Sequence, residues 1–139
     1  MRSFARPPFS VYGMKTTDEL VISYAKNRIE LREVKNEIHQ LTCPTDENGI
    51  YIFNIPEKDT TQGKMTSVRN DWFDCGDGYS YTCWPDGGWT EVLTDLGIED
   101  REMLRLGALW DERKAIVATA GNIKRAIAAR GRKLIRGAA

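Results

Sequence analysis

Residues 98–136 read IEDREMLRLGALWDERKAIVATAGNIKRAIAARGRKLIR, the longest stretch with a single hydrophobic period, and it has no internal proline. Apolar side chains recur at steps of three and four residues once Arg113 and Arg130 are counted in the series. These apolar residues are Leu106, Leu109, Ile116, Ala120, Ile123, Ile127 and Leu134. The period predicts a helix with one apolar seam. At 1.5 Å per residue this helix is roughly 57 Å long, so it needs a partner along its length.

A second seam with the same period lies near the start of the chain. Its members follow at alternating steps of four and three residues: Leu20, Tyr24, Asn27, Leu31, Val34, Ile38 and Leu41. Thr16 or Thr17 can cap this helix, and Pro44 ends it. Two matching seams predict a long antiparallel helical hairpin, with residues about 17–42 and 98–136 as its two helices.

The second helix has features that one partner helix does not explain. Gly107 and Gly121 weaken a helix, so we expect each to allow a close approach or a bend. Met103, Trp110 and Val117 form a second apolar strip at steps of seven. The N-terminal arm, the middle segment or a second copy could cover this strip, which leaves monomer and homodimer open.

The middle of the chain has the composition of a small antiparallel sheet. Its candidate strands are rich in β-branched and aromatic residues and are separated by turn residues. They are 50–55, 65–73, 79–84 and 89–92, with a turn at 85–88. The predicted fold is therefore mainly α (α+β), with a small antiparallel β insert over about 50–92 at the tip of the hairpin.

The chain of 139 residues is 41% hydrophobic, enough to form one core, so we expect a single domain over 1–139. Its predicted parts are an extended N-terminal arm (1–13), a first helix (14–43), an acidic aromatic β insert (44–97) and a second helix (98–136).

Charge is segregated along the chain, although the formal net charge is zero. Residues 1–43 carry seven Lys/Arg against five Asp/Glu, residues 44–103 carry four against thirteen, and residues 104–139 carry nine against two. The net charges of these three blocks are +2, −9 and +7. Such segregation bears on association and steering rather than on fold.

The cysteines and the hydropathy of the sequence indicate the cellular compartment of the protein. Three cysteines cannot all pair within one chain, and reduced thiols are typical of a cytosol. The sequence contains neither the apolar run of a signal peptide nor about 18 consecutive apolar residues. We expect a cytoplasmic protein with no membrane contact.

One residue set matches zinc chemistry: His39, Cys43, Cys75 and Cys83. Three thiolates and an imidazole form an accepted tetrahedral set, which would fix the insert to the first helix. No Cys-x2-Cys knuckle is present. The simpler interpretation is therefore three reduced cysteines, a surface histidine and no cofactor.

The insert combines acids with aromatic side chains. The candidate partner-binding residues are Asp71, Trp72, Asp74, Asp77, Trp84, Asp86 and Trp89. Exposed tryptophans anchor protein interfaces, and a negative surface steers encounter with a basic partner. The alternative is that these aromatic side chains form the core of the insert, with the acids as its solvated rim.

The second helix ends in a group of cations: Lys124, Arg125, Arg130, Arg132, Lys133 and Arg136. Such cations can bind a nucleic-acid backbone. They can equally complement the helix macrodipole and keep the surface soluble, and no aromatic residues for base stacking are interleaved with them.

Residues for catalysis are few. The chain has one histidine, and it lacks a Gly-x-Ser-x-Gly motif, a phosphate-binding glycine loop and an evident pair of carboxylates. We expect a protein that is not an enzyme.

The pairing of ELVISYAKNRIELREVKNEI (19–38) with GALWDERKAIVATAGNIKRAI (107–127), around an insert with Cys and Trp residues, resembles small accessory proteins of tailed bacteriophages and prophages of enteric bacteria. The resemblance implies a phage or prophage protein that binds and blocks an enzyme or defence complex of the host cell. It transfers no functional residues. A nucleic-acid-binding module and a structural or assembly protein are the alternatives.

Overall fold

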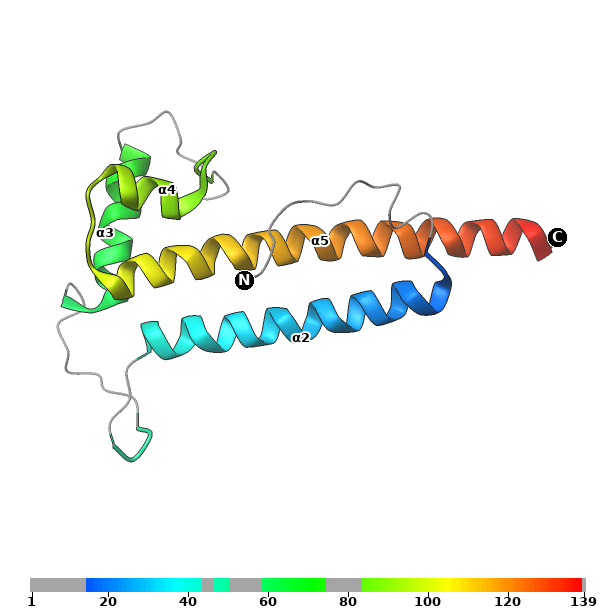
Figure 1. The fold of residues 1–139 in the computed structure, drawn as a ribbon, viewed down its shortest axis with the longest axis horizontal. Coiled ribbons are helices and arrows are strands. Elements are labelled where there is room, and N and C mark those ends of the chain that lie inside the picture. The colour runs from blue at the N-terminus through cyan, green and yellow to red at the C-terminus, as the bar shows by residue number, and fades with distance from the viewer. Residues whose placement is uncertain (1–14, 44–46, 51–58, 75–83, 139) are drawn as a thin grey trace. The chain divides into compact units, whose positions relative to one another are not determined.

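The structure is a computed structural model, and it describes residues 15–43, 47–50, 59–74 and 84–138. This part of the chain holds four helices (Figure 1): α2 (Thr17–Thr42), α3 (Thr61–Asp74), α4 (Gly88–Asp95) and α5 (Arg101–Ala138). The chain forms two compact units. Unit 1 comprises residues 1–35 and 112–139, and unit 2 comprises residues 36–111. In the described part, no helix is long and apolar enough to span a membrane.

The mainly α prediction fits this structure, but the predicted β insert is wrong, because the described residues contain no strand. Met65–Phe73 lies inside α3, and Trp89–Val92 lies inside α4. The reason is the spacing of the apolar residues, since Met65, Val68 and Trp72 follow at steps of three and four. The candidate strand residues 51–55 and 79–83 lie outside the described residues.

The helix α2 occupies the predicted range, and a capping box starts it. The backbone N–H of Glu19 donates to the hydroxyl of Thr16 at 3.2 Å, while the Thr16 N–H donates to the Glu19 carboxylate at 3.3 Å. This reciprocal pair satisfies two of the donors that a helix start leaves unpaired. The cap is therefore Thr16, one of the two residues that the sequence offered.

Unit 1 is built on the predicted seams of α2 and α5. Leu20 of α2 packs with Ile123 and Ala126 of α5. Further along α2, the amide nitrogen of Asn27 donates to the carbonyl oxygen of Ile116 at 3.0 Å. Contacts at higher α2 numbers fall at lower α5 numbers, so the two helices pack antiparallel, and the buried amide bond fixes their register.

Unit 2 has its own apolar core, formed by α3, α4, the first turns of α5 and the end of α2. Its buried members are Met65, Leu93, Met103 and Leu106, with Trp110 packed against them. Two residues of the second apolar strip, Met103 and Trp110, are thus covered within unit 2. The third, Val117, is 53% exposed.

The two mid-helix glycines of α5 differ in their surroundings. A Cβ atom on Gly107 would lie 2.7 Å from the Leu93 Cδ1 atom and 3.6 Å from the Trp89 Cβ atom. On Gly121 the nearest neighbour would be the end of the Arg125 side chain, at 3.5 Å. Gly107 therefore allows α4 to approach α5 closely, whereas Gly121 has no such role.

We predict opposite effects for the same substitution at these glycines. Gly107→Ala should lower the free energy of unfolding by about 1–3 kcal/mol, because the methyl group overpacks the contact with Leu93. Gly121→Ala, the matched control, should raise it by up to about 1 kcal/mol through helix propensity. Urea unfolding followed by circular dichroism measures both. Equal changes in the two variants would contradict the close approach.

Candidate functional site

Asp111 of α5 receives the N-terminal end of α4. Its carboxylate accepts hydrogen bonds from the backbone N–H groups of Trp89 at 2.8 Å and Thr90 at 3.0 Å. The Thr90 hydroxyl donates to it at 2.8 Å, and the indole N–H of Trp84 donates at 3.2 Å. Gly87 occupies the cap position of α4 and supplies no side-chain hydrogen bond. Asp111 therefore caps α4 from another helix, where the carboxylate also suits the positive end of the α4 dipole.

Glycines shape both ends of α4. The Gly88 N–H donates to the Pro85 carbonyl at 2.9 Å, and Gly88 has φ +82. A Cβ atom on Gly88 would lie 2.7 Å from the Asp111 carboxylate. At the other end, Gly97 has φ +71, and the Ile98 N–H donates to the Leu93 carbonyl at 3.0 Å. This is a Schellman motif, which ends the helix and turns the chain toward α5.

The cap also holds an aromatic cluster around Trp89. The ring centroids of Trp72, Trp84 and Trp110 lie 5.6, 5.9 and 6.0 Å from that of Trp89, all in edge-to-face geometry. Trp89 is 1% exposed. It is an interior residue, so the alternative stated from sequence, in which the aromatic side chains form a core, applies to it.

The remaining predicted partner-binding residues occupy different environments. Asp71 and Asp86 are exposed, and Trp72 and Trp84 are half-buried. The side chain of Asp74, at the end of α3, and the whole of Asp77 lie outside the described residues. The structure thus places two predicted acids and two predicted tryptophans where part of each side chain meets solvent.

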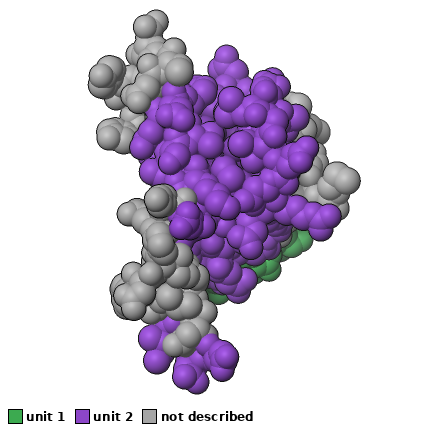
Figure 2. Space-filling model, turned by 90° about the vertical axis from the view of Figure 1, so that its left-hand side faces the viewer, with its two compact units in different colours: residues 1–35, 112–139 green, residues 36–111 purple. Residues whose placement is uncertain are grey.

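The two units segregate charge more completely than the sequence blocks do. Unit 2 (purple in Figure 2) carries five Lys/Arg against fifteen Asp/Glu, a net charge of −10. Unit 1 carries fifteen against five, a net charge of +10. The described part of unit 2 exposes these acids: Glu47, Asp59, Asp71, Asp86, Glu91, Asp95, Glu99 and Glu102. The acidic surface that the sequence predicted is therefore a property of a whole compact unit.

Asp100 has two roles where α3 meets the start of α5. One carboxylate oxygen accepts from the backbone N–H groups of Glu102 and Met103, at 3.0 and 3.2 Å, and so caps α5. The other accepts from the Lys64 ammonium at 2.9 Å. The Lys64 hydrogen bond, followed by the backbone bond from Met103, lowers the pKa of Asp100, and Asp100 raises the pKa of Lys64.

The predicted zinc set is only partly described. Exposed His39 lies in the last turn of α2, and half-buried Cys43 directly follows the helix, with its N–H donating to the His39 carbonyl at 2.8 Å. Cys75 and Cys83 lie outside the described residues, so the set as a whole stays a prediction. Among the residues that are described, no three His, Cys, Asp or Glu side chains gather as a metal ion requires.

The predicted nucleic-acid-binding cations all lie on α5 in unit 1. Five are exposed (Lys124, Arg125, Arg132, Lys133 and Arg136), and Arg130 is half-buried. The Lys124 ammonium and the Arg28 guanidinium each lie 5.9 Å from the ring centroid of Tyr24. An aromatic ring from α2 therefore lies near one of these cations, Lys124, and near Arg28 of its own helix.

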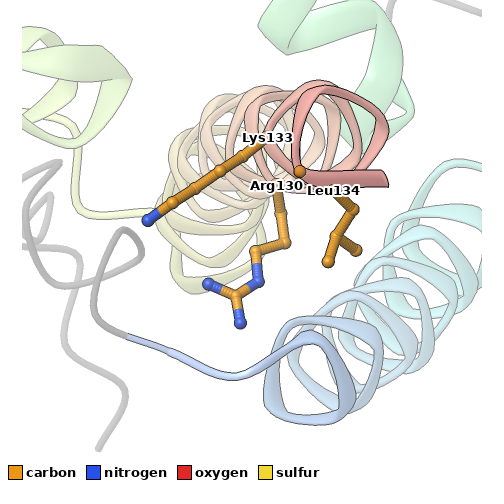
Figure 3. A pocket seen from close by; sticks show the side chains of 4 residues that line it. Arg130, Lys133 and Leu134 are labelled. Atoms are coloured by element: carbon orange, nitrogen blue, oxygen red, sulfur yellow. The ribbon is translucent and has the colours of Figure 1, made fainter. Parts of the chain in front are cut away.

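Arg130 also lines an open pocket of about 590 Å³ near the end of α5, together with Lys133, Leu134 and Gly137. Figure 3 shows Arg130 and Leu134 pointing to the same side of the helix, with Lys133 pointing away from them. The Arg130 Nε atom is buried and has no hydrogen-bond partner among the residues that the structure describes. A buried donor of this kind favours an anionic ligand.

Sequence reasoning missed Asp111, which appeared only as one of two acids in a basic block. The available signal was spacing, since Gly107 and Asp111 are four residues apart and share one face of a helix. A small residue followed one turn later by an acid marks a place where another element can dock end-on.

We expect Asp111→Ala to destabilise unit 2 by about 3 kcal/mol, because four donors lose a charged acceptor. All four tryptophans lie in unit 2, so tryptophan fluorescence during urea unfolding reports this unit. The matched control, Asp86→Ala, changes an exposed acid and should stay within about 0.5 kcal/mol of the parent. Equal midpoints for the two variants would refute the capping role.

The Asp100–Lys64 pair should give a defined pH dependence. Because the folded-state pKa of Asp100 lies below its ordinary 3.8, its contribution is present above pH 3.8 and is lost as pH falls through the folded pKa. The Lys64 pKa is raised above 10.5, so its contribution is lost as pH rises through that higher value. The stability difference between the parent and Lys64→Met should therefore be largest between these limits in urea titrations at several pH values. Lys26→Met, at an exposed lysine of α2, is the control, and a difference independent of pH would contradict the pairing.

Chemically, the described site offers a dense negative surface around a capped, aromatic core. Its most engaged carboxylate, Asp111, serves structure, while the exposed acids remain in contact with solvent and can attract cationic groups. No protein-family model, no curated protein and no solved structure matches this chain.

Proposed function

We propose that the chain is a non-catalytic accessory protein of a phage or prophage that binds and blocks a basic protein of the bacterial host in its cytoplasm. The carrying observation is the net charge of −10 on unit 2, together with its exposed acids. A surface of this sign steers encounter with a basic surface and rejects acidic competitors. Host factors that handle nucleic acid, including defence factors, present such basic surfaces.

Fewer tryptophans are available for this contact than the sequence indicates. Trp72 and Trp84 are half-buried and retain solvent-facing area beside exposed Asp71 and Asp86. Trp89 supports both rings from inside the unit. The proposed interface is therefore centred on Asp71, Trp72, Trp84 and Asp86, with tryptophan edges as apolar anchors and carboxylates as the charged surround. Blocking is steric, because the bound unit covers the basic surface.

A nucleic-acid-binding module is the second candidate, and it would use unit 1 instead. The observation in its favour is the ring of Tyr24, which lies near Lys124 and Arg28 in a unit of net charge +10. Aromatic rings among cations are typical of surfaces that stack bases. The two functions depend on different units, so one set of variants separates them.

The test is affinity capture from a nuclease-treated lysate of an enteric host, followed by measurement of the dissociation constant with the purified partner. Asp71→Lys combined with Asp86→Lys should weaken binding at least about tenfold, because attraction becomes repulsion. Asp18→Lys with Glu30→Lys changes charge equally on exposed positions of α2 and should leave affinity within about twofold. Unchanged affinity in the unit 2 variant would reject the proposal. In a gel-shift assay, DNA or RNA binding that strengthens as the salt concentration falls and weakens on Lys124→Glu would favour the second candidate.

A further inference from the structure

Two exposed patches of opposite charge each contain large apolar side chains. The tail patch comprises half-buried Arg130 with exposed Lys133 and Leu134, which line one pocket near the end of α5, in unit 1. The loop patch comprises Asp95, Leu96 and Glu99 between α4 and α5, in unit 2. Leu134 and Leu96 are 57% and 59% exposed. Exposed apolar side chains beside charges of a single sign are a common composition of association surfaces.

The tail patch is a continuation of the α5 seam beyond its partner. Ile123, beside Leu20 near the start of α2, is 2% exposed, whereas Leu134 is three turns further along α5 and exposed. Arg130, one of the two seam positions between them, has a buried Nε atom without a hydrogen-bond partner among the described residues, and it lines the pocket with Lys133 and Leu134. In the described part of the chain, this end of the seam therefore leaves Leu134 exposed and the Arg130 Nε atom without an acceptor.

The loop patch has excess negative charge at a position where a cation would be favourable. Asp95 is the last residue of α4, and this helix has no basic residue in its last turn. Its negative charge adds to the negative end of the α4 dipole, where a cation would be favourable. Leu96 and exposed Glu99 flank the Schellman turn at Gly97, which holds the patch in a fixed conformation.

We infer that the tail patch of one copy binds the loop patch of a second copy. A carboxylate of Asp95 or Glu99 pairs with the Arg130 guanidinium or the Lys133 ammonium, and Leu96 packs against Leu134. Each chain carries both halves of this contact. Tail on tail and loop on loop are excluded as contacts, because each would bring like charges together.

The net charge of the chain also favours a second copy as the partner. The formal net charge is zero, so two copies do not repel at a distance, while their units of −10 and +10 attract when correctly oriented. A contact between unlike patches is heterologous, and its free patches can bind further copies. The association should therefore grow with protein concentration and lose strength with salt.

This inference is independent of the proposed function, since it requires no host protein and uses neither Asp71 nor Asp86. Its measurement is the weight-average mass of the purified, nucleic-acid-free full chain by sedimentation equilibrium. At about 50 mM salt the mass should rise with concentration, and at about 500 mM salt, where screening is strong, it should return toward one chain.

Charge-swap variants give the sharpest result. A tail variant (Arg130→Glu with Lys133→Glu) and a loop variant (Asp95→Lys with Glu99→Lys) should each associate at least about tenfold more weakly alone. An equimolar mixture should associate like the parent, because each reversed patch meets its opposite on the other variant. Circular dichroism confirms folding. A second tail variant, Lys133→Glu, changes one exposed residue of the patch and should also weaken association.

The control, Lys26→Glu with Lys35→Glu, reverses two exposed cations of α2 and should leave association unchanged. A parent that stays one chain at low salt and about 1 mM overturns the inference, as does a mixture that stays unassociated. Association that requires added DNA or RNA also overturns it, because the tail patch would then bind phosphates.

Discussion

The carboxylate of Asp111 is the contact on which unit 2 depends. A short helix such as α4 cannot stabilise itself, since its nucleation cost is spread over few residues. Its cap residue, Gly87, offers no side-chain acceptor, so the unpaired N–H groups at its start require one from elsewhere. Asp111 supplies that acceptor and also receives the Trp84 indole. The same bonds that start α4 therefore fix the aromatic core.

Steric and polar constraints on α5 act together at this point. Gly107 and Asp111 lie one turn apart on one face, where the first admits Leu93 to the helix surface and the second bonds the end of α4. Without the glycine, α4 would be too far from α5 for bonds at 2.8–3.0 Å. Without the carboxylate, close packing would bury unpaired donors. Unit 2 thus needs both residues at this spacing.

The sequence predicted the helix pair well because its seams repeat over many turns, and the contacts of Leu20 with Ile123 and of Asn27 with Ile116 follow from that period. In the middle segment the strand prediction was wrong, because it followed the β-rich composition and not the short helical period of Met65, Val68 and Trp72. A Gly97-Ile98 helix stop was present but not recognised. The spacing of Gly107 and Asp111 indicates a docking position on α5, but the partners of Asp111 could not be assigned from sequence, since they lie more than twenty residues earlier and their approach depends on tertiary packing.

The segregation of charge into two units has an energetic consequence. Like charges within each unit repel, and this lowers the stability that the buried seams and the Trp89 cluster provide. Interspersing the same twenty cations and twenty acids would avoid that repulsion without changing the net charge of zero. The stability lost to this repulsion is regained only when each unit binds a surface of the opposite charge. Because screening limits such attraction to about 8–10 Å, it acts at contact and favours one orientation of the partner. The charge pattern is therefore suited to oriented association rather than to long-range attraction.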